Sequence, residues 1–249
     1  MTPPVGPPGP PTPAGFASSG SASGSHSRRQ TVRWPDWWRR HRGQLALVVA
    51  ALLPPSWAFA TLATRVRAGG SFAFDLPILD FARALGSPAL DRFFVAMSQL
   101  GYLYGVVPFD IALVMFLLLR RQWRVAAFAT LALAGSGLLN VLTKQVFARD
   151  RPALWESIAP ETTWSFPSGH AMGSATLAVV LILLAWHTRW RWPVIVAMAA
   201  FVLLVGFSRV YLGVHYPSDI LAGWAVASVW TAASFLAVFR GRYRLRQRG

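Results

Sequence analysis

The chain has 249 residues, of which 54% are hydrophobic and only 13% are charged, and its formal net charge is +15. Water-soluble domains carry roughly 25% charged residues, so this composition excludes an ordinary soluble domain and indicates an integral membrane protein. The absence of cysteine excludes disulfides and thiol chemistry. Because the arginines gather at the ends of apolar runs, we attribute the charge to cytoplasmic loops facing anionic lipid rather than to nucleic-acid binding.

Residues 1–43 are predicted to form a disordered, basic segment in the cytoplasm. The first 30 residues are rich in Pro, Gly, Ser and Ala and show no apolar periodicity, which is typical of a disordered tail. Tryptophan and arginine are interspersed between Arg33 and Arg42. This mixture predicts an anchor at the membrane interface, with rings at the headgroup level and guanidinium groups on lipid phosphates.

Six apolar runs follow within residues 44–239. They are Leu45–Thr64, Gly101–Leu119, Val125–Thr143, Ala171–Trp186, Pro193–Phe207 and Ile220–Phe239. Runs of this length predict an all-α fold, a polytopic membrane protein with a bundle of six transmembrane helices. Between the first two runs the charges are too frequent for a crossing. Ser87 followed by Pro88 there predicts the start of a short amphipathic helix at the membrane surface.

The distribution of basic residues predicts the orientation of the bundle. Sixteen arginines lie in the N-terminal segment, the loops after the second and fourth runs, and the tail at residues 240–249, whereas the opposite side carries eight basic residues. The positive-inside rule therefore places both termini in the cytoplasm of a cell-membrane protein. The basic tail is expected to face lipid headgroups.

Three polar segments are predicted to meet on the opposite, extracytoplasmic face. Lys144–Pro152 follows the third run, Pro167–His170 opens the fourth, and Ser208–Asp219 lies between the fifth and sixth. By the parity of the crossings, all three lie at one depth on one side. Charged groups beside hydrocarbon are costly, so their gathering there indicates a functional site.

The cations of these segments indicate a site for a phosphate. The side chains with a fixed positive charge are Lys144, Arg151, Arg209 and, as a possible fourth, Arg149. Arginine binds phosphate oxygens bidentately and lysine acts as a compact charge. Ser168 and Gly169 precede an apolar helix whose free backbone N–H groups can bind an anion. We expect Gly169 to serve this site and Gly173 to allow close helix packing.

Two histidines and a carboxylate complete the predicted catalytic set. Pro217 suits the first turn of the last helix, which places His215 just before that helix and Asp219 within its first turn. A carboxylate there can accept the Nδ1 hydrogen of His215 and leave Nε2 as a nucleophile. His170 can donate a proton to the leaving oxygen. The nine acidic residues include no cluster suited to Mg²⁺, so we expect no metal and no cofactor.

The three segments resemble the signature of a known family. Its parts are Lys144-x6-Arg151-Pro152, Pro167-Ser168-Gly169-His170 and Ser208-Arg209-x5-His215-x3-Asp219. Together they are similar to the type 2 phosphatidic acid phosphatase superfamily, which includes lipid phosphate phosphatases and vanadium haloperoxidases. The resemblance covers residues 45–239. It implies a six-helix membrane core, a phosphohistidine on His215, acid catalysis by His170 and independence from metal. The phosphate contacts it implies are Lys144, Arg151, Ser168, Gly169, His170 and Arg209.

The predicted function is hydrolysis of a phosphate monoester or pyrophosphate on a lipid. Polyprenyl pyrophosphate, phosphatidylglycerol phosphate and phosphatidic acid all fit the chemistry of the site. Two alternatives stay open: a vanadate-dependent peroxidase that uses the same pocket, and a non-catalytic lipid-binding membrane protein. The expected partners are a lipid-linked phosphate and membrane lipids, without nucleic acid, and the sequence predicts no oligomeric state.

Overall fold

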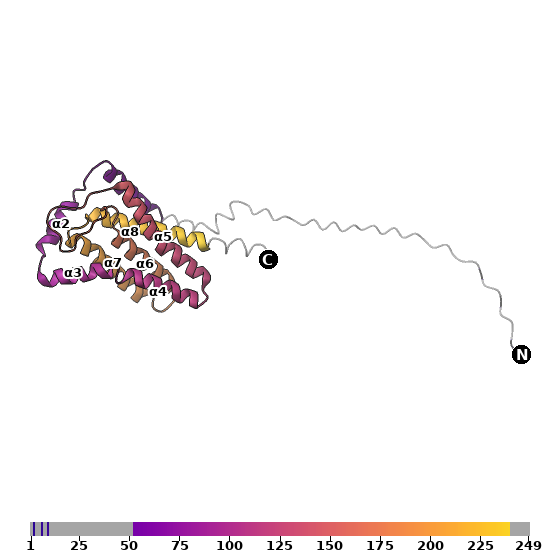
Figure 1. Ribbon diagram of the computed structural model, residues 1–249. Coiled ribbons are helices and arrows are strands. Elements are labelled where there is room, and N and C mark those ends of the chain that lie inside the picture. The colour runs from indigo at the N-terminus through magenta and orange to yellow at the C-terminus, as the bar shows by residue number, and fades with distance from the viewer. Residues whose placement is uncertain (1, 3–5, 7–8, 10–51, 240–249) are drawn as a thin grey trace. The chain divides into compact units, whose positions relative to one another are not determined.

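The computed structural model describes residues 52–239, together with Thr2, Gly6 and Gly9. The predicted disordered segment, the interfacial anchor, the start of the first apolar run and the basic tail therefore lie outside the described residues. Within residues 52–239 all regular secondary structure is helical, and the prediction of an all-α fold is confirmed. A helical segment at residues 52–67 precedes the remaining helices in Figure 1, which are α2 (Asp75–Ala84), α3 (Pro88–Leu100), α4 (Val106–Leu119), α5 (Trp123–Phe147), α6 (Gly169–Ala185), α7 (Arg191–Tyr211) and α8 (Pro217–Phe239).

Three of these helices, α5, α7 and α8, are long and apolar enough to cross a membrane, and α4 and α6 are shorter apolar helices. Helix α7 is longer than the predicted fifth run, Pro193–Phe207, because the helix continues through the start of the polar motif to Tyr211. The helix of the second run begins later than the predicted start at Gly101. Residues 101–105 form turns, and α4 starts only at Val106. Two glycines, Gly101 and Gly105, lower the helix propensity of that stretch.

Helix α6 occupies the middle of the bundle, where it packs against α4, α5, α7 and α8 (Figure 1). Its N-terminus lies especially close to α8. A Cβ atom added to Gly223 would lie 2.9 Å from the carbonyl oxygen of Ser168, so glycine is needed for this contact. The close approach holds the first turn of α6 beside the first turns of α8, and both carry residues of the predicted site.

The segment between the first two apolar runs forms the helices α2 and α3. The Ser87 side chain caps α3 by accepting a hydrogen bond from the backbone N–H of Leu90, with Pro88 in the first turn, as predicted. Helix α3 packs along α7, and α2 contacts both α7 and α8. The buried carboxylate of Asp75 ties α2 to the start of α8, since it accepts a hydrogen bond of 2.9 Å from the backbone N–H of Ser218.

Candidate active site

The predicted site residues gather at one end of the bundle. Lys144 lies in the last turn of α5, Ser168 caps α6, Arg209 lies in the last turn of α7, and Asp219 lies in the first turn of α8. The loop at residues 148–168 joins α5 to α6 across this end. The connections at the opposite end carry the arginines of the predicted cytoplasmic loops, namely Arg120, Arg121, Arg189 and Arg191.

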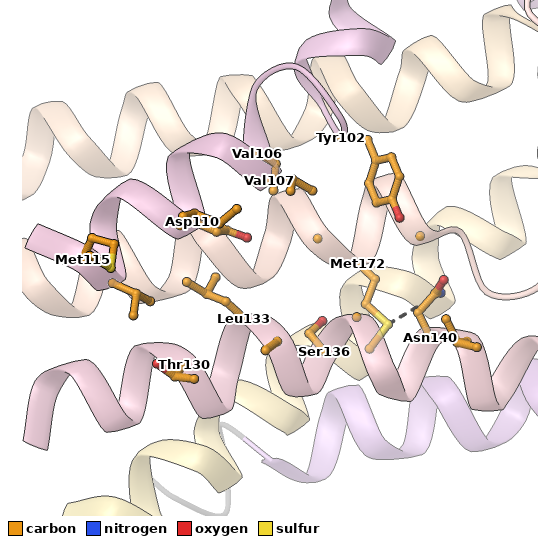
Figure 2. A pocket seen from close by; sticks show the side chains of 17 residues that line it. Tyr102, Val106, Val107, Asp110, Met115, Thr130, Leu133, Ser136, Asn140 and Met172 are labelled. Carbon is orange, nitrogen blue, oxygen red and sulfur yellow. Dashed lines mark hydrogen bonds between the residues drawn. The ribbon is translucent and has the colours of Figure 1, made fainter. Parts of the chain in front are cut away.

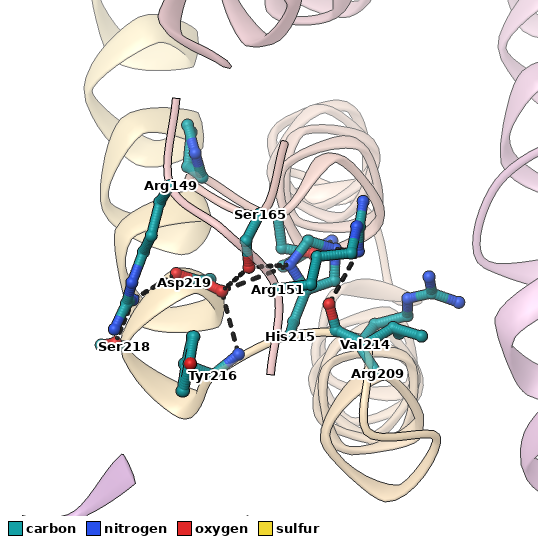
Figure 3. Close-up of polar contacts among 12 residues, drawn as sticks. Arg149, Arg151, Ser165, Arg209, Val214, His215, Tyr216, Ser218 and Asp219 are labelled. Carbon is teal, nitrogen blue, oxygen red and sulfur yellow. Dashed lines mark hydrogen bonds and ion pairs between the residues drawn. The ribbon is translucent and has the colours of Figure 1, made fainter. Parts of the chain in front are cut away.

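His215 is completely buried at the centre of the cluster (Figure 3). Its Nδ1 lies 3.4 Å from Oδ2 of Asp219 and 3.3 Å from Oγ of Ser165, and its Nε2 lies 3.1 Å from Nη1 of Arg151. A guanidinium nitrogen can only donate, so Nε2 must be the ring nitrogen that carries the lone pair. The hydrogen is then on Nδ1, facing Asp219. Ser165 donates its own hydroxyl hydrogen to Asp219.

The electrostatic surroundings keep this imidazole neutral. Burial lowers the pKa of His215 well below its ordinary value of 6.5, and the positive charges of Arg151, Arg209 and Lys144 lower it further. Burial also lowers the pKa of Arg151, and Glu161 and Asp219 oppose this by favouring the charged guanidinium. At neutral pH the site therefore combines an uncharged imidazole with fixed cations, which is the combination that a nitrogen nucleophile attacking a phosphate requires.

A carboxylate that the sequence analysis did not single out lies among the predicted phosphate ligands. Oε1 of Glu161 lies 2.5 Å from Nη2 of Arg209 and 4.0 Å from Nδ1 of His170. Its other oxygen, Oε2, lies 3.5 Å from Nη2 of Arg151. Glu161 thus brings an anion to the side chains that were predicted to bind one. Its carboxylate charge partly compensates the buried guanidinium of Arg209.

Thr163 joins two of the predicted cations. Its hydroxyl accepts hydrogen bonds from Nζ of Lys144 at 2.7 Å and from Nη2 of Arg151 at 3.1 Å. Its carbonyl oxygen accepts a third bond, from Nε of Arg151, at 2.7 Å. The loop therefore holds Lys144 and Arg151 together at the side of His215.

The start of α6 is organised by Asn140 of α5. Nδ2 of Asn140 donates to the carbonyl oxygen of Pro167 at 3.1 Å. A Cβ atom on Gly169 would lie 2.8 Å from Oδ1 of Asn140, so glycine is required at 169 by close packing. The expected role of Gly173 is not observed. A Cβ atom there would meet only Val106, at 3.8 Å, because Gly173 borders an open groove instead.

Arg149, named above as a possible fourth phosphate ligand, points elsewhere. It approaches Asp219 from the side away from His215 (Figure 3). Its Nη1 lies 2.5 Å from Oδ1 of Asp219 and its Nη2 lies 3.2 Å from Oδ2 of Asp75. Two carboxylates thus take up the guanidinium, which leaves Lys144, Arg151 and Arg209 as the cations beside His215.

An apolar groove of about 450 Å³ runs from the site along α4, α5 and α6 (Figure 2). At the end near the site it is bordered by Gly169, Asn140 and Tyr102, and the ring of Tyr102 lies 5.0 Å from that of His170 between centroids. Asp110 lines the groove further along, and its Oδ1 has no hydrogen-bond partner within the described part of the chain. The groove offers an apolar chain a surface that leads directly to His170.

Four residues of this site escaped the sequence analysis: Asp75, Glu161, Thr163 and Ser165. Three of them belong to the loop at residues 148–168, which has no periodicity to interpret. One signal was available, because Glu156 and Glu161 are the only glutamates of the chain and both follow closely after the basic motif Lys144–Pro152. An acidic residue so placed is expected to pair with one of those cations.

The comparisons with known proteins define the class of the chain. The model of the PAP2 superfamily matches residues 123–243, which include every predicted site residue. A relative from Sulfolobus acidocaldarius, described as an undecaprenyl-diphosphatase, is 33% identical over 154 residues, which cover 60% of this chain and 69% of the relative. The chain belongs to the PAP2 superfamily, and the resemblance stated above is confirmed.

Two further comparisons, one of sequence and one of structure, extend the likeness to Bacillus subtilis. Phosphatidylglycerophosphatase B is 27% identical over 173 residues, which cover 68% of this chain and 85% of that protein. The crystal structure of a transmembrane PAP2-type phosphatidylglycerolphosphate phosphatase superposes with a TM-score of 0.64 at 25% identity, covering 77% of this chain and 96% of the other. The fold described here is thus the fold of a solved membrane phosphatase.

Proposed function

We propose that the protein is an integral membrane phosphatase that hydrolyses a phosphate monoester or pyrophosphate on a lipid. The observation that carries the proposal is the arrangement at His215, whose Nε2 bears the lone pair and lies 3.1 Å from a guanidinium nitrogen of Arg151. The named relatives support it, since they are phosphatases of an undecaprenyl diphosphate and of a phosphatidylglycerol phosphate.

In the first step Nε2 of His215 attacks the phosphorus atom. An N–P bond forms while the bond from phosphorus to the lipid-side oxygen breaks. His170 binds a proton once the bound phosphate adds its negative charge to the site, and it gives that proton to the leaving oxygen. Lys144, Arg151 and Arg209 stabilise the charge on the phosphoryl oxygens. Asp219 holds the Nδ1 hydrogen and stabilises the ring as it becomes positive, since its Oδ2 lies 3.4 Å from Nδ1.

In the second step water attacks the phosphohistidine. His170, now neutral, takes a proton from the water as the O–P bond forms, and the N–P bond breaks with its electron pair returning to Nε2. Inorganic phosphate is released and His170 is protonated again. Ser168 and Gly169 are assigned to the phosphate through the free N–H groups at the start of α6, where Ser168 is the N-cap residue.

The groove along α4, α5 and α6 suits the hydrocarbon chain of the substrate. It is lined mainly by apolar side chains and ends at Gly169 and at Tyr102, beside His170. A chain lying in it would place its phosphate at the cations. The arginines at the far end of the bundle support an orientation with the site on the extracytoplasmic face and both termini in the cytoplasm.

Phosphate release by the purified protein tests the proposal. Undecaprenyl diphosphate, phosphatidylglycerol phosphate and phosphatidic acid are offered in detergent with a metal chelator present. We expect release from at least one, and a loss of at least about a thousandfold in His215→Ala. His187→Ala changes an imidazole at the opposite end of the bundle and is the control. Retained turnover in His215→Ala, or halide oxidation with vanadate but no phosphate release, would contradict the proposal.

A further inference from the structure

A buried chain of charges lies behind the proposed nucleophile, on the side away from the cations of the phosphate site (Figure 3). It starts at Asp75 on α2, passes through Arg149 in the loop after α5, and ends at Asp219 on α8. The three side chains are 1%, 12% and 0% exposed. Charges buried to this degree are costly unless each has its partners, so the arrangement needs an explanation.

Every oxygen of the two carboxylates has a donor. Asp75 accepts from the backbone N–H of Ser218 at 2.9 Å, from its hydroxyl at 2.7 Å, and from Arg149 at 3.2 Å. Oδ1 of Asp219 accepts from Arg149 at 2.5 Å, and its Oδ2 accepts from Ser165 and from the backbone N–H of Tyr216. These bonds fix the Asp219 carboxylate on both sides, with Oδ2 turned toward His215.

Arg149 is also fixed in its own position. Its guanidinium carbon lies 4.0 Å from the centroid of the Tyr216 ring, and its Nη1 donates to Ser218 at 2.8 Å. The stacked ring and the two carboxylates leave the guanidinium no direction in which to reach the phosphate site. Its function must therefore be sought in its effect on Asp219.

We propose that Asp75 and Arg149 are positioning residues, which hold Asp219 against Nδ1 of His215 and set the net charge that the imidazole experiences. The inference rests on the proposed function, because only a reacting His215 needs this orientation. Arg149 offsets the charge of Asp219, and Asp75 offsets that of Arg149. A change in either residue should therefore alter the electrostatic surroundings of His215 with a definite sign.

Other charges face His215 and must stay constant in the test. They are Lys144 from α5, Arg151 from the loop, His170 from α6, Arg209 from α7 and Asp219 from α8. None of them is changed in the variants chosen. The exposed Asp80 lies on α2 with Asp75 but makes no contact with the charge chain, so Asp80→Asn is a matched control.

The test measures the pH profile of kcat in the full-length protein. Arg149→Gln removes a positive charge, so protonation of His215 becomes easier and the acid limb should move up by about one pH unit. Asp75→Asn removes a negative charge, so the limb should move down. In the double variant the acid limb should return toward its position in the unaltered protein. The control Asp80→Asn should leave the limb where it is in the unaltered protein. Arg149→Lys keeps the positive charge, so its acid limb should stay at the pH of the unaltered protein. This variant, together with Asp75→Asn, preserves the test if Arg149→Gln does not fold.

The same order can be read without turnover. Protein labelled with nitrogen-15 at histidine gives His215 signals that are assigned by their loss in His215→Gln. The pH at which these signals titrate should be higher in Arg149→Gln and lower in Asp75→Asn than in the unaltered protein. Phosphate release with no displacement of the limb, or with displacement in one direction in both single variants, would overturn the positioning role alone. The expected order by NMR in a protein that releases no phosphate would retain the charge chain and overturn the proposed function.

Discussion

Oε1 of Glu161 lies 2.5 Å from Nη2 of Arg209, inside the group of cations to which the substrate phosphate is assigned. A phosphate that binds Arg209 and Arg151 must share them with this carboxylate or displace it. The carboxylate and the phosphate are both negative and would contact the same guanidinium groups, so they repel each other. Glu161 is therefore expected to weaken the binding of anions to the resting site. The side chain is 27% exposed and lies on a loop, which allows it to move away.

Replacing this carboxylate tests the competition. Glu161→Gln keeps the shape but removes the charge, so we expect phosphate and vanadate to inhibit about fivefold more strongly, corresponding to ~1 kcal/mol. Inhibition constants for both anions give the measurement. Glu156→Gln alters the other, exposed glutamate of the same loop and should leave both constants unchanged. Weaker inhibition in Glu161→Gln would show that the carboxylate assists anion binding instead.

The pH dependence follows from the surroundings of His215. Only the neutral imidazole can attack phosphorus, and burial together with nearby cations lowers the pKa of His215 well below 6.5. Activity should therefore persist as the pH falls through 6.5 and decline only where His215 begins to bind a proton. The acid limb of kcat/KM between about pH 4.5 and 8 measures this directly. An acid limb centred at or above 6.5 would contradict the assignment of His215 as a buried neutral nucleophile.

The contact between α5 and α6 at the site predicts a specific packing defect. Gly169→Ala would place a Cβ atom 2.8 Å from Oδ1 of Asn140, so we expect a loss of roughly 1–3 kcal/mol in stability. Asn140→Ala removes that oxygen and also a hydrogen bond to Pro167. The loss of stability in the double variant should consequently be smaller than the sum of the losses in the two single variants. Thermal unfolding in detergent measures this coupling, and strictly additive losses would show that the two residues do not clash.

The start of the second motif could be predicted from the sequence, whereas the reason for its glycine could not. Ser168 and Gly169 at the start of an apolar helix and Pro217 in the first turn of α8 follow from local rules, and both placements are observed, with Ser168 as the N-cap residue of α6. The neighbour that requires glycine at 169 lies on another helix. Only the packing of α5 against α6 brings Asn140 there, and no local pattern contains that information.

The loop at residues 148–168 shows a second limit. The basic motif residues could be identified by their charge and spacing, but Arg149 was grouped with them although it pairs with two carboxylates. Charge alone does not tell which way a guanidinium points. Glu161, Thr163 and Ser165 are ordinary loop residues in sequence. Their contacts arise because the loop folds back over the ends of α5 and α7.

Filling the apolar groove should separate long substrates from short ones. Gly173 borders the groove with free space around it, so Gly173→Phe would place a ring where the hydrocarbon chain is proposed to lie. We expect KM for a long-chain lipid phosphate to rise about tenfold or more, while hydrolysis of a short-chain analogue changes little. Leu138→Phe, on an exposed face of α5 outside the groove, is the control. An equal effect on both substrates would place the chain elsewhere.

The identity of the phosphorylated atom decides the central claim. Turnover of a radiolabelled lipid phosphate, stopped within milliseconds at alkaline pH where phosphohistidine survives, should leave label on the peptide that contains His215. The label should disappear when unlabelled substrate is added and turnover continues before the reaction is stopped. It should also be absent from the variant His215→Gln. Label on any other residue, or steady hydrolysis by His215→Gln, would contradict nucleophilic attack by this imidazole.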